Sequence, residues 1–331
     1  MLDIAADNIT ANNKPIKPLG KLFKINEDFN TNKVNEESIA KTIKDSLLEF
    51  KKMNAYVTQR NKIYPDSLNI YVTPKTKFSK SGKSWWRWGN NKVNMNINYI
   101  VKMPVTNSVD LNNDYGNINL DKLEGHAKIN CDYGEITTKE LLAENNNISF
   151  DYTNNSYFEY INSAEINADY SGFTVGQTKS LHIKADYTKS KVEIAENITY
   201  SCDYGSFSVD KINNLEGNGD YLTVRIGDVY RNIHINADYG SLKIDQMTAN
   251  AGNLTVESNY LGITIGYHPD YHFNFDANIE YGSMKNTADF EFTKKNIESN
   301  TNYYQGYYGS RSTANLIKIN SDYGSVTFKK N

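Results

Sequence analysis

The segment INADYGSLKI, residues 235–244, contains the pattern that decides the fold of this chain. An apolar, a polar, a small and an acidic residue lead to a tyrosine, and a second alternating run follows. Eleven tyrosines occur in this context, with gaps of 18, 19, 18, 17, 17, 17, 18, 21, 21 and 42 residues: Tyr115, Tyr133, Tyr152, Tyr170, Tyr187, Tyr204, Tyr221, Tyr239, Tyr260, Tyr281 and Tyr323. A near-constant period of strand-forming residues is typical of a solenoid in which each repeat forms one coil.

Alternation within each repeat predicts which side chains face the core. Counted from the tyrosine, position −4 is mostly Ile, Leu or Val, position −2 is mostly small, and positions +3 and +5 are apolar. This period of two is typical of half-buried strands. Because the tyrosine shares the phase of positions −4 and −2, we expect it to point inward and to stack on its neighbours. Six repeats have Gly at position +1, where we expect a corner with positive φ.

The repeat is too short for a crossover helix, so each coil must stack directly on the next and pair in parallel. We therefore expect an all-β, right-handed parallel β-helix of about 12 coils with a small α/β cap at its N-terminal end. The helix of that cap is expected from Asn35 onward, because apolar residues recur there at helical spacing. The expected organisation is a disordered leader at residues 1–20, the cap and first coils at 21–105, and the solenoid at 106–331, with an inserted loop at about 292–314.

Whole-chain composition excludes some functions. The net charge of −3 and the pI near 6.0 argue against a nucleic-acid partner, which requires clustered Lys and Arg. No stretch is long and apolar enough for a membrane helix, and the N-terminus lacks the apolar core of a signal peptide. Cys131 and Cys202 occupy the same position four repeats apart, roughly 19 Å at one coil spacing per repeat, so we predict two free, buried thiols.

The acidic residue before each tyrosine is the sharpest chemical feature of the repeat. It is Asp in nine copies, Asn259 in one and Glu280 in another. A column of carboxylates could bind calcium, or each Asp could accept a hydrogen bond from a backbone N–H of the following turn. We favour the second interpretation and expect no metal site. His182 and His234 are separated by three coils, and His268 and His272 form a weak pair, so no catalytic or cofactor site is expected.

Two aromatic segments are candidate contact surfaces: one contains Trp85, Trp86 and Trp88, and the other contains Tyr303, Tyr304, Tyr307 and Tyr308. The first could contact a sugar or a membrane interface, or it could fold over the N-terminal end of the core. The second has the Tyr and Gly content of adaptable recognition surfaces, but it is equally compatible with a flexible loop.

Four stretches resemble the adhesin-like β-solenoid family of Bacteroidota cell envelopes, a domain of unknown function. They are VKMPVTNSVDLNNDYGNINLDKLEGHAKINCDYGEI at 101–136, FDYTNN at 150–155, INADYSGFTV at 166–175 and INSDYGSVTF at 319–328. The resemblance extends from about residue 60 to the end. It implies export to the periplasm or cell surface by a signal peptide, which is not present in this chain. It implies no functional residues.

These observations favour a non-enzymatic exported envelope protein, an adhesin or interaction scaffold that contacts glycans or proteins at the cell surface through its solenoid faces. A periplasmic structural or envelope-stress-associated protein is the alternative. A carbohydrate-active enzyme is the third interpretation, because parallel β-helices include such enzymes. Those enzymes need acids that converge in a cleft, whereas the acids of this chain form a regular column.

Overall fold

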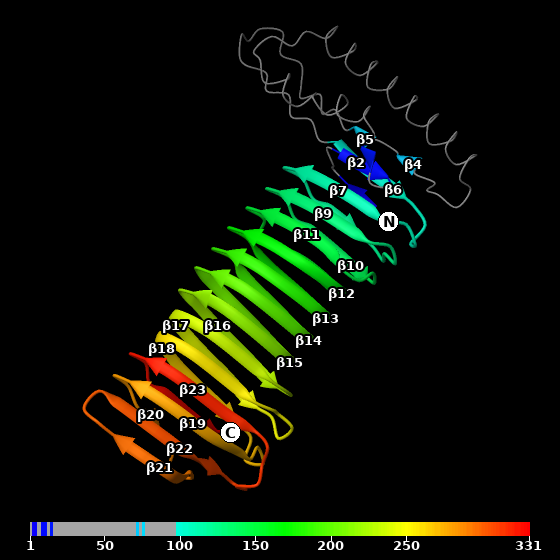
Figure 1. Ribbon diagram of the computed structural model, residues 1–331. Helices are drawn as coiled ribbons and strands as arrows, with labels where there is room; N and C mark the ends of the chain where they lie inside the picture. Colours follow the sequence, from blue (N-terminus) through cyan, green and yellow to red (C-terminus); the bar gives the residue numbers. More distant parts are fainter. Residues whose placement is uncertain (1, 5–7, 12–13, 16–70, 73–74, 77–96) are drawn as a thin grey trace, which may run out of the picture. The chain divides into compact units, whose positions relative to one another are not determined.

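The computed structural model describes residues 2–4, 8–11, 14–15, 71–72, 75–76 and 97–331. These residues form strands and loops without any helix, so none of them belongs to a helix that could cross a membrane. The fold is a parallel β-solenoid of about nine turns, as the repeat predicts (Figure 1). The expected helix from Asn35 lies outside the described residues, and neither the coil count of about 12 nor the N-terminal cap is confirmed.

The chain divides into two compact units, residues 1–143 and 144–331. In the first unit, β7 pairs in parallel with β9 and β8 with β10, while β1 and β2 pair antiparallel to β8 and β7. Residues of the expected leader therefore form strands. The strands of this unit are β1 (Leu2–Ile4), β2 (Asn8–Ala11), β3 (Lys14–Pro15), β4 (Tyr71–Val72), β5 (Lys75–Thr76), β6 (Ile97–Lys102), β7 (Val109–Asp114), β8 (Ile118–Leu120), β9 (Ala127–Asp132) and β10 (Ile136–Leu141).

The second unit contains the regular stack of coils. Its strands are β11 (Asn146–Asp151), β12 (Ser156–Asp169), β13 (Gly172–Asp186), β14 (Lys189–Asp203), β15 (Gly205–Asp220), β16 (Leu222–Val229), β17 (Ile233–Met247), β18 (Leu254–Tyr267), β19 (Phe273–Glu280), β20 (Met284–Lys285), β21 (Glu291–Ile297), β22 (Thr301–Tyr308), β23 (Leu316–Asp322) and β24 (Val326–Lys330). From β12 to β15 one long strand spans each coil, and it bends where two successive residues, such as Lys179 and Ser180, both face outward. The polar residues that link one repeat to the next therefore belong to a strand rather than to a loop.

The predicted core positions are confirmed. Residues at −4, −2, +3 and +5 are buried in nearly every coil, and the parallel register aligns each with its equivalents, as in Ile166, Ile183 and Tyr200. The two cysteines are buried and are not joined in a disulfide, as predicted. Burial raises the pKa of the Cys131 thiol to about 11 and that of Cys202 to about 12, since a thiolate would lose its hydration there.

The predicted inward orientation of the tyrosines is wrong. All eleven have φ between 49° and 60°, the left-handed region, and their side chains are 43–79 % exposed. One left-handed residue reverses the phase of the strand, so the next residue, for example Thr188, is buried instead. The predicted positive φ at the following glycines is also wrong. A Cβ at Gly205 would clash with the carbonyl oxygen of Thr188, so this glycine permits close approach of two coils.

The C-terminal end of the second unit departs from sequence order. β23 pairs in parallel with both β18 and β19, so the last coil of the chain lies between two coils that are consecutive in sequence (Figure 1). The expected insertion contains the hairpin of β21 and β22, which adds antiparallel strands to β19. Buried rings pack within this end of the unit: Tyr267, Phe273, Phe290, Tyr308 and Phe328.

Candidate functional site

The exposed tyrosines of the second unit form a continuous column. In stack order they are Tyr152, Tyr170, Tyr187, Tyr204, Tyr221, Tyr239, Tyr260, Tyr323 and Tyr281. Neighbouring ring centroids are 4.5–5.2 Å apart, and the ring planes differ by 3–6°. In the first unit Tyr115 and Tyr133 stack in the same way, at 4.9 Å. Each column presents ring edges and phenol groups to solvent as a narrow ridge.

Backbone geometry places these rings outside the core. A left-handed conformation costs a non-glycine residue about 1–2 kcal/mol, and Asn or Gly is the usual choice there. Two interactions hold the tyrosines in it. The rings stack, and the backbone N–H of seven of the eleven tyrosines donates to the carbonyl oxygen of the acidic residue in a neighbouring coil, as Tyr187 does to Asp203 at 2.9 Å. Strain repeated at exposed positions points to a role other than stability.

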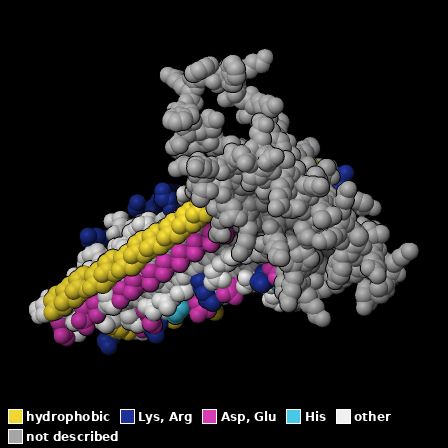
Figure 2. All heavy atoms as spheres, turned by 90° about the horizontal axis from the view of Figure 1, so that it is seen from above, with side chains coloured by type: hydrophobic (Ala, Val, Ile, Leu, Met, Phe, Trp, Pro, Cys, Tyr) yellow, Lys and Arg dark blue, Asp and Glu magenta, His cyan; other side chains and the backbone are white. Residues whose placement is uncertain are grey.

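A column of carboxylates runs beside the tyrosines, and Figure 2 shows the two stripes in parallel. The Oδ1 atom of Asp169 accepts a hydrogen bond from the backbone N–H of Asp186 at 3.0 Å, and the same bond recurs from Asp151 to Asp238 at 2.8–3.3 Å. The predicted backbone donor is therefore present, and it belongs to the equivalent residue of the next coil. This bond fixes the orientation of each carboxylate.

Within the part of the chain that the structure describes, five of these carboxylates lack a cationic partner. Among the described residues, no Lys, Arg or His lies within salt-bridge distance of Asp169, Asp186, Asp203, Asp220 or Asp238. Their Oδ2 atoms also have no hydrogen-bond donor within that part of the chain. The column therefore presents uncompensated negative charge at a regular spacing.

The pKa of three phenols in the column, those of Tyr204, Tyr239 and Tyr323, is raised above the ordinary value for tyrosine. Desolvation in the stack, followed by the neighbouring phenols and carboxylates, raises the pKa of Tyr239 above its ordinary value. Ionisation of these three phenols therefore adds no negative charge to the surface near neutral pH.

A shallow groove of about 450 Å³ follows the acidic column on its other side. Its polar wall comes from position −3, where Ser149, Asn167 and Ser201 offer hydroxyl and amide groups. Lys184 also lines the groove, but its Nζ lies 2.9 Å from Glu165 Oε1, and this hydrogen bond lowers the pKa of Glu165. We call the tyrosine column, the acidic column and this groove the Tyr–Asp face.

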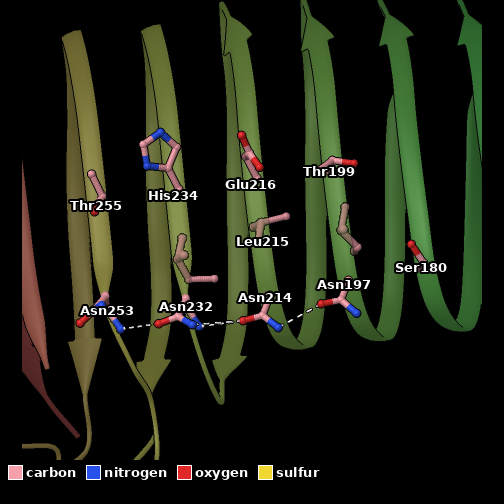
Figure 3. A pocket seen from close by; sticks show the side chains of 12 residues that line it. Ser180, Asn197, Thr199, Asn214, Leu215, Glu216, Asn232, His234, Asn253 and Thr255 are labelled. Carbon is pink, nitrogen blue, oxygen red and sulfur yellow. Dashed lines mark hydrogen bonds between the residues drawn. The ribbon is translucent and has the colours of Figure 1, made fainter. Parts of the chain in front are cut away.

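A second shallow groove of about 410 Å³ lies along the two outward columns seven and five residues before the tyrosine (Figure 3). Asn197, Asn214 and Asn232 form a ladder in which Asn214 Nδ2 donates to Asn197 Oδ1 at 3.0 Å and Asn232 Nδ2 donates to Asn214 Oδ1 at 3.3 Å. The opposite wall carries Glu216 and His234. These amides are used within the ladder, which indicates a structural role for it.

The structure separates the sequence-predicted contact residues. Trp85, Trp86 and Trp88 lie outside the described residues. The four tyrosines of the second segment belong to β22. Tyr304 and Tyr308 are buried in the C-terminal packing, while Tyr303 and Tyr307 are half-buried, with the Tyr303 hydroxyl donating to Asp276 at 3.1 Å. The contact role of Tyr303 and Tyr307 remains a prediction.

Sequence reasoning missed the tyrosine column as a surface, although the pattern contained a signal. The apolar residues before the tyrosine stand at even-numbered positions, −4 and −2, whereas those after it stand at odd-numbered positions, +3 and +5. The two-residue alternation of buried side chains therefore shifts by one residue between the two runs. The tyrosine stands where this shift occurs, so alternation alone does not decide whether its side chain points into the core or toward solvent. Within the described residues, no group of three or more His, Cys, Asp or Glu side chains is arranged to hold a metal ion.

Searches against known protein families, curated proteins and solved structures found no match. The link to Bacteroidota envelopes and to adhesins therefore rests on the sequence resemblance alone.

Proposed function

We propose that this protein is a non-catalytic scaffold of the cell envelope, exported to the surface or periplasm, which binds a glycan or another protein through the Tyr–Asp face. The observation that carries the proposal is the column of nine stacked, exposed tyrosines held in a strained backbone conformation. Monomeric proteins rarely expose so continuous a stripe of aromatic side chains without a binding role.

The column suits binding for two physical reasons. Tyrosine combines a large apolar ring with a hydroxyl that can donate or accept a hydrogen bond. Stacking between neighbouring coils also fixes each ring before a partner arrives, as Tyr187 is fixed between Tyr170 and Tyr204. Little side-chain entropy is then lost on association, so even modest contacts contribute to affinity.

A binding screen with matched variants tests the proposed face. The protein would be applied to an array of bacterial glycans and to immobilised envelope proteins of the source cells. Replacement of Tyr170, Tyr187 and Tyr204 by Asn removes three rings while retaining a residue that tolerates positive φ. The control replaces Tyr157 and Tyr230, which are exposed outside the column, by Asn. Selective loss of binding in the column variant supports the proposal, and equal binding by both variants contradicts it.

Protease treatment of intact source cells tests the proposed location. Peptides of this chain released without lysis would support a surface scaffold. Cleavage only after rupture of the outer membrane would place it in the periplasm and favour the structural or envelope-stress role. A protein that stays protected inside the inner membrane would contradict export.

A further inference from the structure

We propose that the partner of the Tyr–Asp face is a cationic glycan, a linear polymer of amino sugars with free amines. This inference rests on the proposed binding role of the face and specifies the chemistry of its ligand. Three properties of the face support it: the sign of its charge, the polar groups beside that charge, and the spacing of its repeats.

Charge complementarity is the first argument. Over the nine coils of the column, position −1 supplies seven aspartates and Glu280, whereas the adjacent outward positions −3 and +2 supply two cations, Lys184 and Lys189, and one further acid, Glu257. Lys184 is already paired with Glu165. The backbone bonds that orient the carboxylates keep like charges close together, which costs Coulomb energy. A polymer with repeated positive charges relieves this repulsion along the whole column.

The groups around the charge favour a sugar. Ser149, Asn167 and Ser201 line the groove beside the carboxylates with small hydroxyl and amide groups. Such groups exchange hydrogen bonds with the hydroxyls of a sugar, and carboxylates accept from them as well. The tyrosine edges border the same strip and offer apolar surface to a pyranose ring. An amino-sugar polymer presents amines, hydroxyls and apolar ring surfaces together.

Spacing disfavours an extended basic peptide laid along the column. Side chains on one side of a β-strand recur every ~6.6–6.8 Å. The rings of the column recur every 4.5–5.2 Å, so such a peptide falls out of register within two or three coils. The groove is shallow, partly open and lined by residues of four successive coils, which suits a polymer running along the coils rather than a small molecule.

Calorimetric titration of the full chain with three oligomers of equal length tests the inference. The first is a glucosamine oligomer with free amines, the second is its fully N-acetylated and uncharged counterpart, and the third is oligolysine. We expect the glucosamine oligomer to bind, the acetylated one to fail, oligolysine to bind more weakly, and the binding to weaken as salt is added.

A charge-neutralising variant assigns that binding to the face. Asp186→Asn with Asp203→Asn removes two charges but keeps the Oδ1 acceptors, and Asn259 already occupies this position in one coil. We expect the double variant to weaken binding about tenfold, because two exposed ion pairs are lost. The control, Asp210→Asn with Asp228→Asn, removes two charges six and seven residues after the tyrosine and should bind as the parent chain does.

Each remaining outcome overturns the inference. Equal binding of the acetylated oligomer would eliminate the role of charge, and tighter binding of oligolysine would eliminate the sugar. Equal loss in both double variants would mean that binding is not local to the face. If none of the three oligomers binds, the cationic-glycan inference fails, whereas the proposed function fails only if the column variant also behaves as the parent on the arrays.

Discussion

The strand positions before each tyrosine and the tyrosine itself recur with the same period, yet they lie on opposite sides of the coil wall. Ile183 is fully buried, whereas Tyr187, four residues later and in the same even phase, is 51 % exposed. The left-handed conformation of the tyrosine separates the two, because it interrupts the alternation of the strand. The buried column supplies stability, and the exposed column carries strain that burial does not offset, which is why we assign binding to it.

The largest loss of stability is expected from a substitution in the buried column at position −4. Ile183→Ala should reduce the free energy of unfolding by about 2–5 kcal/mol, because it leaves a cavity between two coils that cannot close around it. Chemical denaturation of the variant and the parent chain measures this difference. A change no larger than that of an exposed substitution such as Ile194→Ala would contradict the assignment of the core.

The next largest loss of stability is expected where an aromatic ring and a glycine pack together in the same column. Tyr200 occupies position −4 where most coils have an aliphatic residue, and its ring fills the space above Gly217 in the next coil. Gly217→Ala should cost about 1–3 kcal/mol through overpacking against this ring. Tyr200→Ile in the same chain should recover part of the loss. Denaturation midpoints of the two single variants and the double variant would show this coupling, and additive losses would argue against the contact.

The acidic column should show a smaller effect. Asp238 Oδ1 accepts hydrogen bonds from the backbone N–H and the Nδ2 of Asn259, at 2.8 and 2.9 Å. Asp238→Ala removes both and should cost about 1.5 kcal/mol. Asp238→Asn retains an acceptor oxygen and should cost less. Thermal unfolding of the two variants compares them, and an equal loss for Asn and Ala would mean that the charge, rather than the acceptor oxygen, matters.

The smallest difference in stability is expected at the left-handed backbone of the column tyrosines. Tyr187→Ala and Tyr187→Gly both remove the ring from its two neighbours, but only Gly relieves the left-handed backbone. The Gly variant should therefore be more stable than the Ala variant by about 1 kcal/mol. Urea denaturation can resolve a difference of this size. Greater stability of the Ala variant would show that the corner is not strained.

Much of the fold follows from the sequence because a short-range pattern determines it. Residues within one repeat and its neighbours determine the period, the parallel stacking and the inward positions. They also determine that the two cysteines are buried and too far apart for a disulfide. The tyrosine orientation depends on one backbone torsion at a phase slip, which alternation alone does not resolve. The place of β23 between β18 and β19 is a long-range pairing. The gap of 42 residues before Tyr323 indicates an insertion, but it does not indicate that the last coil lies between two earlier coils.

Hydroxyl-radical footprinting of the full chain, with and without the glucosamine oligomer, tests the central claim that the exposed tyrosine column is the contact surface. The account predicts that the labelling of Tyr170, Tyr187 and Tyr204 falls on binding, while that of Tyr157 and Tyr230 stays unchanged. Binding that leaves the three column tyrosines as reactive as in the free protein would contradict the claim and place the contact on another face.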